Sequence, residues 1–312
     1  MGADWPGEAD EPAEGDSSPD ASRSGGGRRV PAETRSRQEY YDELHRTVSA
    51  TARQNAAEEQ AAAEKWDEAA EESRWMWTEY ERKWPPDERP PVDTSADPPG
   101  SWRADGDRFL PTATNKRVDA ECDRVADRER DQISPAMRAV ESQDPDRHLI
   151  GFDDRRKGRD RIKEKVCDKI EEKNRTPKEA ISLIPDAIRY TFQYKESRYT
   201  QGVWDDIARL KERGFELVKR KNFWAEEQYK GINSQWIDPG SGQRFEVQFH
   251  TRISFEAKQL THRSYERLRT KQADKFEELV LEAFQAKVAA QVPVPPGADS
   301  ISDYPERGRD AR

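Results

Sequence analysis

The feature that most constrains the fold is a pair of alternating segments around a short turn. The segments YKGINSQWID and QRFEVQFHT alternate apolar and polar side chains, and PGSG lies between them. This pattern predicts a β-hairpin between about residues 230 and 250. Successive side chains of a strand point to opposite faces. One face of the second strand is therefore apolar, and the other carries Glu246, Gln248 and His250.

Solvated strand faces more often carry Thr, Lys or Arg than a row of a carboxylate, an amide and an imidazole. Such a row suits metal binding or proton abstraction beside a substrate. The alternative interpretation is an ordinary polar face with no chemical role, and the strand by itself leaves both open.

Around the hairpin, the pattern alternates between helices and strands. Apolar spacing and composition predict helices at about 114–143, 156–173, 177–183, 200–213, 253–270 and 273–290. Two further strands are expected at 186–194 and 215–221. The order indicates an α+β domain with one mixed sheet flanked by helices.

Composition divides the chain into five parts. Hydrophobic residues make up only 33% and charged residues 38%, so part of the chain is expected to be extended or disordered. The expected parts are a disordered acidic tail (1–37), a long helix or helical hairpin (38–84), a proline-rich linker (85–112), the α+β domain (113–291) and a disordered tail (292–312).

Charge is unevenly distributed along the chain. The formal net charge is −9, but residues 151–270 hold 27 Lys and Arg against 20 Asp and Glu, a net of +7. The rest of the chain carries −16. A basic segment in an acidic chain indicates an anionic ligand, for which phosphate is the natural candidate. The alternative is a solvated basic face balanced by the acidic arm.

The cellular location is predicted from segments that the sequence lacks. No run of eighteen apolar residues is present, and the acidic N-terminus lacks the basic and apolar regions of a signal peptide. The two cysteines show no metal-binding spacing. A cytoplasmic protein is expected, and a secreted effector is the alternative.

Basic residues gather at the start of the second predicted helix. Arg155, Lys157, Arg161 and Lys165 lie at near-helical spacing. Cations at a helix start oppose its macrodipole unless an anion such as triphosphate compensates. The alternative is a solvated basic helix with acidic partners nearby.

Asp186 and Arg189 stand at the start of the first predicted strand. A carboxylate there could share a divalent cation with Glu246, because two carboxylates commonly anchor Mg²⁺ with phosphates. A helix cap or surface ion pair is the alternative.

Two further groups flank the polar strand. Tyr229, Lys230 and Asn233 begin the hairpin, where a Tyr ring can lie flat against a base and a Lys beside phosphates. After the hairpin, Lys258 and His262 belong to a polar helical stripe. An aromatic plug and a surface stripe are the respective alternatives.

Taken in order, five motifs resemble one family. R-x-K-x3-R-x3-K, D-A-I-R-Y, Y-K-G-I-N, E-V-Q-F-H-T and T-H-x2-Y-E are similar to the synthetase domain of RelA/SpoT-type (p)ppGpp synthetases, especially small alarmone synthetases and their toxic relatives. The resemblance covers about residues 148–270.

The resemblance implies a nucleotidyltransferase-like mixed sheet that binds ATP with Mg²⁺ and moves pyrophosphate to a 3′-hydroxyl. Glu246, Gln248 and Asp186 would be catalytic, with Asp186 and Glu246 on Mg²⁺ and Glu246 also a candidate base. ATP and its phosphates would be held by Arg155, Lys157, Arg161, Lys165 and Arg189. The acceptor nucleotide would lie on Tyr229, Lys230 and Asn233, supported by His250 and His262.

The chain departs from the family pattern at three positions. Arg161 stands where the family usually has Ser, and Asn233 stands where it has His. Asp186 lies three positions before Arg189, whereas the family's Asp lies five before. The H-D dipeptide of the associated hydrolase domain is missing, which predicts synthesis without degradation.

Three functions follow as hypotheses. The first is synthesis of (p)ppGpp-like alarmones from ATP and GTP or GDP. The second is toxin-like pyrophosphate transfer to the 3′ end of tRNA or to adenosine nucleotides. The third, of another class, is a degenerate nucleotide-sensing or interaction module. The 38–84 helix would be a neutralising element, or the surface for a homo-oligomer or a partner protein.

Overall fold

The computed structural model describes residues 37–85, 92–105, 107–173, 175–270 and 273–305. The chain divides into two units, residues 1–50 and 51–312, and all contacts given below belong to the second. Within the described ranges, no helix is both long and apolar enough to cross a membrane. Residues 1–36 of the predicted acidic tail lie outside these ranges.

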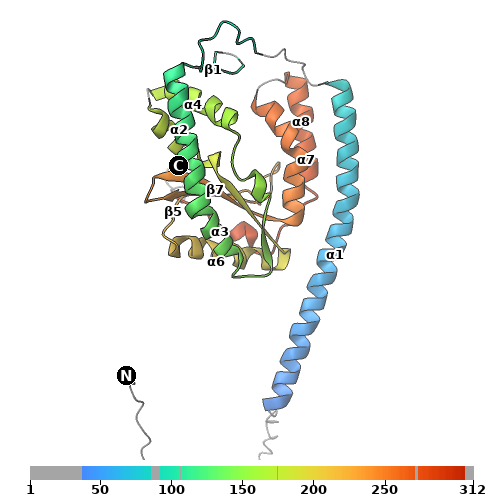
Figure 1. The fold of residues 1–312 in the computed structure, drawn as a ribbon. Helices are drawn as coiled ribbons and strands as arrows, with labels where there is room; N and C mark the ends of the chain where they lie inside the picture. The colour runs from blue at the N-terminus through green and yellow to red at the C-terminus, as the bar shows by residue number, and fades with distance from the viewer. Residues whose placement is uncertain (1–36, 86–91, 106, 174, 271–272, 306–312) are drawn as a thin grey trace, which may run out of the picture. The chain divides into compact units, whose positions relative to one another are not determined.

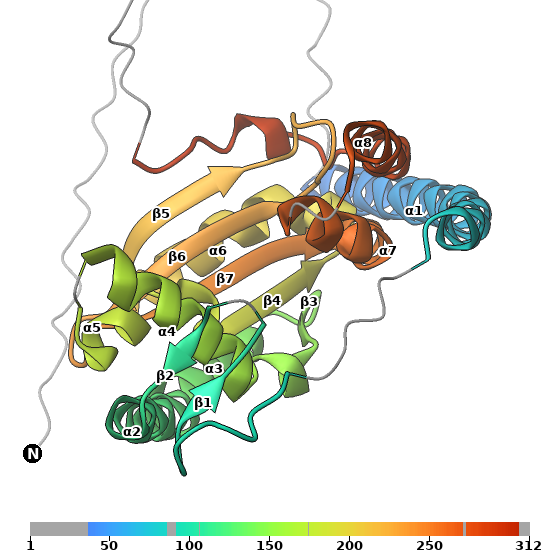
Figure 2. The same ribbon diagram turned by 90° about the horizontal axis from the view of Figure 1, so that it is seen from above.

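A five-stranded sheet forms the centre of the second unit, in the order β3-β4-β7-β6-β5 (Figure 2). Only β4 and β7 are parallel, and the other three pairs are antiparallel. The strands are β3 (Arg147–Ile150), β4 (Arg189–Tyr194), β5 (Glu216–Asn222), β6 (Ile232–Asp238) and β7 (Gln243–Thr251). The predicted α+β class with one mixed sheet is confirmed.

The predicted hairpin is β6 and β7, which pair from Asp238 opposite Gln243 back to Ile232 opposite Phe249. The apolar face of β7 is fully buried. It is covered by α6 (Tyr199–Glu212), whose Tyr199 hydroxyl donates to the Phe249 carbonyl at 2.8 Å. The sheet's other face is therefore the one that presents the polar row of Glu246, Gln248 and His250.

Helices flank both faces of the sheet. In Figure 2, α4 (Arg159–Lys173) and α7 (Arg252–Arg269) stand in front of the sheet while α6 lies behind it. The polar face of the sheet is thus on the same side as α4 and α7. Four more helices are α2 (Thr112–Arg128), α3 (Ser134–Glu141), α5 (Pro177–Ser182) and α8 (Lys275–Ala289).

The helix predicted at 114–143 is interrupted by a π-helical turn, Glu129–Ile133, between α2 and α3. Glu129 is completely buried, and it accepts hydrogen bonds from Ser134, Tyr190 and Arg155. Single π-turns inside helices often mark functional sites. Here the turn directs a carboxylate inward, which apolar spacing along the helix does not reveal.

Asp186 is not on a strand, which corrects the prediction that strand β4 begins at residue 186. Pro185–Ala187 form a 3₁₀ turn, and the strand begins at Arg189. A proline lacks the backbone N–H that a strand ladder needs. The 3₁₀ turn, and not strand alternation, therefore sets where the Asp186 carboxylate lies.

The predicted N-terminal arm is one continuous helix, α1 (Arg37–Lys83), with no hairpin. Its C-terminal part packs on α7 and α8 (Figure 1). Trp66 is 1% exposed, and its indole N–H donates to Glu256 of α7 at 2.6 Å. Tyr80 donates to Glu277 of α8, which also binds Arg267. The arm is thus joined to the helix that follows the polar row.

Part of the predicted linker is ordered. Trp102–Arg103 (β1) pairs with Phe109–Leu110 (β2) in a short antiparallel ladder. Trp102 donates to Asp160 of α4 at 2.9 Å. Trp102 therefore attaches the ordered part of the predicted linker to α4. Residues 86–91 of the linker lie outside the described ranges.

The predicted disordered tail is corrected for residues 292–305. Ala298 and Ile301 are buried, and Tyr304 exchanges two backbone hydrogen bonds with Arg220 of the edge strand β5. Covering an edge strand satisfies its free backbone groups. Residues 306–312 of the tail lie outside the described ranges.

Replacing Trp66 tests how tightly α1 is held. Trp66→Ala should lower the free energy of unfolding by about 3–5 kcal/mol, because it removes a buried aromatic ring and leaves a cavity. Trp75→Ala is the matched control, since Trp75 lies on the same helix and is 64% exposed. It should change stability by less than about 0.5 kcal/mol. Urea unfolding measures both, and equal effects would contradict the docking of α1.

Candidate functional site

Strand register brings polar residues of four strands onto one face of the sheet. Arg189 of β4 lies opposite Glu246 of β7, which lies opposite Gln235 of β6. One step along, a second line crosses the sheet through Thr191, Gln248, Asn233 and Lys221. Because alternation is kept across neighbouring strands, these side chains share the face that α6 does not cover.

Glu246 sits near the middle of this face and is held by two donors. The Gln248 amide donates to Glu246 Oε1 at 2.6 Å, and Arg189 Nε donates to Oε2 at 3.2 Å. The side chain of Glu246 is only 12% exposed. Each carboxylate oxygen therefore has a protein partner, and the group is fixed in one orientation.

Asp186 is surrounded by three cations. Lys165 of α4 binds both of its oxygens at 2.8 and 2.7 Å. Lys157 lies 3.1 Å and Arg189 3.4 Å from Asp186 Oδ2. We call Lys157, Lys165 and Arg189 the cation cluster. It leaves a surplus of positive charge at the edge of the polar face.

Backbone pairing explains why the cation cluster forms. The Lys157 amide donates to the Ala187 carbonyl at 3.0 Å, and the Arg189 amide donates to the Arg155 carbonyl at 2.7 Å. The segment before α4 is thereby attached to the segment before β4. This pairing brings a basic stretch of the sequence to Asp186, which is 29 positions from Lys157.

The charges of this region stabilise one another. Burial raises the pKa of Asp186, but the ion pairs with Lys165 and Lys157 outweigh it and the pKa is lowered. Burial lowers the pKa of Arg189, but the carboxylates of Glu246 and Asp186 outweigh it and the pKa is raised. Arg189 therefore stays charged and bridges the two carboxylates.

Tyr229 is fixed at the other end of the polar row. Its hydroxyl donates to Asn233 Oδ1 at 2.9 Å and lies 2.9 Å from His250 Nε2. Its ring meets Phe223 and His250 edge-to-face. Burial and the Lys258 charge hold the pKa of His250 well below its usual range, so the imidazole is neutral.

Gly231 permits the close approach of the hairpin to His250. Its φ of +144° is one that side chains rarely adopt. A Cβ at this position would lie 2.7 Å from the His250 ring. The glycine thus allows the Tyr229 hydroxyl to reach the His250 imidazole, and this contact fixes the plane of the Tyr229 ring.

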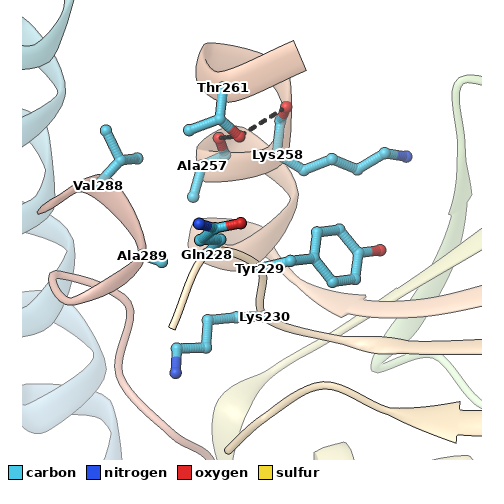
Figure 3. Close-up of a pocket in the computed structure, with 8 residues that line it drawn as sticks. All are labelled: Gln228, Tyr229, Lys230, Ala257, Lys258, Thr261, Val288 and Ala289. Atoms are coloured by element: carbon cyan, nitrogen blue, oxygen red, sulfur yellow. Dashed lines mark hydrogen bonds between the residues drawn. The ribbon is translucent and has the colours of Figure 1, made fainter. Parts of the chain in front are cut away.

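Helix α7 contributes side chains next to the polar row from the side opposite to α4. Lys258 donates to Gln248 Oε1 at 2.6 Å, and His262 lies one turn further along at the exposed rim. Figure 3 shows the Lys258 and Tyr229 side chains pointing to the same side. The small pocket that they help to line has room for about one water molecule. This pocket is therefore too small to hold a nucleotide.

Three predicted site residues are placed apart from these groups. Arg155 donates to Glu129 at 2.6 Å and stacks on Phe152. Arg161 pairs with Glu164 on the surface of α4 at 3.0 Å. Lys230 donates to two backbone carbonyls of the preceding loop, at 3.0 and 2.5 Å. Their assigned roles in substrate binding stay predictions.

Other members of the site were not found from the sequence. Thr191, Gln235 and Lys221 lie beside Gln248, Glu246 and Asn233 through strand register, which depends on the pairing of distant segments. Glu129 fixes Arg155 from a helix whose pattern is apolar. The alternation of β5 and β6 was a usable signal for Gln235 and Lys221, whereas nothing local indicated Glu129.

The carboxylates of Asp186 and Glu246 suit a metal ion bound together with phosphates better than a metal ion bound alone. In the part of the chain that the structure describes, no three His, Cys, Asp or Glu side chains gather as a metal site. All four oxygens of Asp186 and Glu246 accept from cations or an amide. Mg²⁺ is commonly held by one or two carboxylates together with substrate phosphates. A polyphosphate would bind the cation cluster and release the carboxylates.

Comparison with known proteins adds a limited finding. No protein-family model and no curated protein matches the chain. Among solved structures, a GTP pyrophosphokinase family protein from Streptococcus pneumoniae matches at 13% identity and TM-score 0.37, covering 58% of this chain and 90% of that one. Small alarmone synthetase 1 from Bacillus subtilis, bound to its product pppGpp, matches at 14% identity and TM-score 0.30, covering 44% and 70%. Similarity this distant does not support a functional argument. The functional argument therefore rests on the residues of this chain.

The cation cluster should bind polyphosphate without metal. In the presence of EDTA, Asp186→Asn should strengthen tripolyphosphate binding about tenfold, because it removes the internal competitor for three cations. Lys165→Met should weaken binding by a similar factor. Titration calorimetry measures both, with Arg159→Met as the control from the same helix, because Arg159 pairs with Asp119 and Asp123. Equal weakening by Arg159→Met and Lys165→Met would show that binding is not local to the cluster.

Proposed function

We propose that this chain is an ATP-dependent pyrophosphotransferase that moves the β,γ-pyrophosphate of ATP to the 3′-hydroxyl of a nucleotide. The observation that carries the proposal is the continuous line from the cation cluster through Arg189 to Glu246 and Gln248. It sets an anion-binding region directly beside a fixed carboxylate. Of the residues that the motif resemblance assigns, Lys157, Lys165, Asp186, Arg189, Glu246 and Gln248 belong to this line, whereas Arg155, Arg161 and Lys230 do not.

The charge balance supports a polyphosphate donor. Lys157, Lys165 and Arg189 face the carboxylates of Asp186 and Glu246, which leaves one positive charge in excess. The Lys258 ammonium lies close by on the α7 side. Phosphoryl transfer depends chiefly on positioning and on neutralising charge, with little covalent chemistry by the protein. A cluster that already holds an internal anion is arranged for that task.

In the proposed reaction, the 3′-hydroxyl oxygen of the acceptor attacks the β-phosphorus of ATP. The bond between that phosphorus and the bridging oxygen on its α side breaks, and AMP leaves with that oxygen. The hydroxyl proton passes to the carboxylate of Glu246, which acts as the base. Gln248 and Arg189 hold the carboxylate in line for this transfer.

Mg²⁺ would be held by Asp186, with Glu246 as its second carboxylate neighbour, and would supply neutralisation of charge on the triphosphate. The residues of the cation cluster bind the same phosphates from the other side. Displacement of Lys157 and Lys165 from Asp186 toward the phosphates frees a carboxylate at the moment the donor binds. Substrate binding and metal binding would then be coupled.

The acceptor would lie between Tyr229 and the β5 side of the polar face. The Tyr229 ring is held in a set plane by Asn233 and His250, which suits stacking on a base. A guanosine nucleotide, GTP or GDP, is the acceptor that the motif resemblance favours. An RNA 3′ end, as in tRNA, is a second candidate, because Lys219 and Lys221 extend the polar face toward the edge strand.

Label transfer tests the proposal directly. ATP labelled at the γ-phosphate is incubated with Mg²⁺ and, separately, with GDP, GTP, ATP and bulk tRNA. Label should move to one acceptor with equimolar release of AMP, and a kinase that moves only the γ-phosphate would release ADP instead. Glu246→Gln should lower the rate about 10²–10⁴-fold because it removes the base. Bound ATP with no transfer to any acceptor would leave a nucleotide-sensing module.

Coupling of metal and donor gives a second test. Mg²⁺ alone should show no saturable binding at millimolar concentration, because cations occupy the Asp186 oxygens. With α,β-methylene-ATP, Mg²⁺ should strengthen nucleotide binding, and Asp186→Asn should abolish that gain. Calorimetry with and without the analogue measures both. Tight binding of Mg²⁺ without the analogue would contradict the coupling.

A further inference from the structure

Lys258 lies where the motifs assign no chemical role, yet it touches the catalytic strand. Its ammonium donates to Gln248 Oε1 at 2.6 Å, and Gln248 Nε2 donates to Glu246 Oε1 at 2.6 Å. The three side chains form a chain of two short hydrogen bonds. It runs from helix α7 to the carboxylate in the middle of the polar face.

Lys258 and Glu246, at the two ends of this hydrogen-bonded series, determine the orientation of the Gln248 amide between them. An ammonium can only donate hydrogen bonds, and a carboxylate can only accept them. With Lys258 at one end and Glu246 at the other, the Gln248 amide has one orientation that satisfies both. Without the lysine, the amide oxygen has no donor in this chain, and the amide can turn.

We propose that Lys258 is a positioning residue, whose ammonium fixes the Gln248 amide so that Gln248 holds the Glu246 carboxylate toward the attacking hydroxyl. The inference rests on the proposed function, since that function gives Glu246 its role as base. Lys258 acts through Gln248 and does not itself touch the reacting atoms.

The surroundings of Lys258 make the positioning dependent on pH. Burial and the nearby Arg189 charge, opposed by Glu246, lower the pKa of Lys258 to about 8. The ammonium is present below that pH and is lost as pH rises through it. A neutral amine can accept as well as donate, so it no longer dictates the amide orientation. The charged and titratable groups around it are Glu246 and His250 on β7, Arg189 on β4, Tyr229 before β6, and His262 on α7.

Steady-state kinetics between pH 6.5 and 9.5 test the inference with Lys258→Met and Lys258→Arg. Lys258→Met should lower kcat about 10- to 100-fold, with little change in KM for ATP, because the base is misaligned. The wild type should lose kcat as pH rises through about 8. That loss should be absent in Lys258→Met and should move to higher pH in Lys258→Arg, whose guanidinium stays charged.

Arg263→Met is the matched control, because Arg263 lies on the same helix, pairs with Glu81 at 2.6 Å and is 68% exposed. It should retain the wild-type kcat and pH profile. Wild-type kcat and an unchanged alkaline loss in Lys258→Met would overturn the inference while leaving the proposed function in place.

A readout without catalysis separates the inference from the proposed function. The Gln248 side-chain amide can be identified in ¹⁵N spectra as the signal lost in Gln248→Glu. Its protons should exchange slowly with solvent in the wild type and in Lys258→Arg, and at least about tenfold faster in Lys258→Met. Unchanged exchange in Lys258→Met would overturn the inference. If the wild type transfers no label to any acceptor, the proposed function fails, and amide exchange alone then decides whether Lys258 orients Gln248.

Discussion

The parallel pairing of β4 with β7 is the constraint on which the rest of the site depends. It sets Arg189 directly beside Glu246, although the two are 57 positions apart in the sequence. Because the guanidinium also reaches Asp186, one side chain connects the polar row to the cation cluster. Changing the register by one residue would turn one of the two partners to the apolar face and separate them.

Each flanking helix contributes to this centre from a different side. Helix α4 brings Lys165 to Asp186, and helix α7 brings Lys258 to Gln248. Glu246 and Arg189 come from the sheet, Asp186 comes from the 3₁₀ turn before β4, and Lys165 and Lys258 come from the helices. The ion pairs and hydrogen bonds form one connected series, Lys165–Asp186–Arg189–Glu246–Gln248–Lys258, in which the neutral Gln248 amide links Glu246 to Lys258. In the proposed function, donor binding displaces Lys157 and Lys165 from Asp186, whereas Arg189, Gln248 and Lys258 keep the Glu246 carboxylate in position.

Local patterns predicted most of the architecture. The hairpin, the short helix expected at 177–183, and the division of β7 into an apolar and a polar face all follow from short-range rules. The start of β4 was predicted wrongly because Pro185 breaks an otherwise strand-like segment. The contacts of Arg155 and Lys230 were beyond prediction, since they depend on Glu129 and on backbone carbonyls that tertiary folding brings near. Local rules describe elements, whereas pairing between distant segments decides which basic residues meet which acidic ones.

The C-terminal segment bears on how this protein can associate with others. Tyr304 forms backbone hydrogen bonds with both the amide and the carbonyl of Arg220 on β5. The Arg220 guanidinium lies against the Trp204 ring. The chain thus supplies its own extra strand residue where an edge would otherwise accept a foreign strand. At that point, growth of the sheet by strand addition from another molecule is blocked. Assembly there would first require release of residues 298–305, including the buried Ala298 and Ile301, from the rest of the domain.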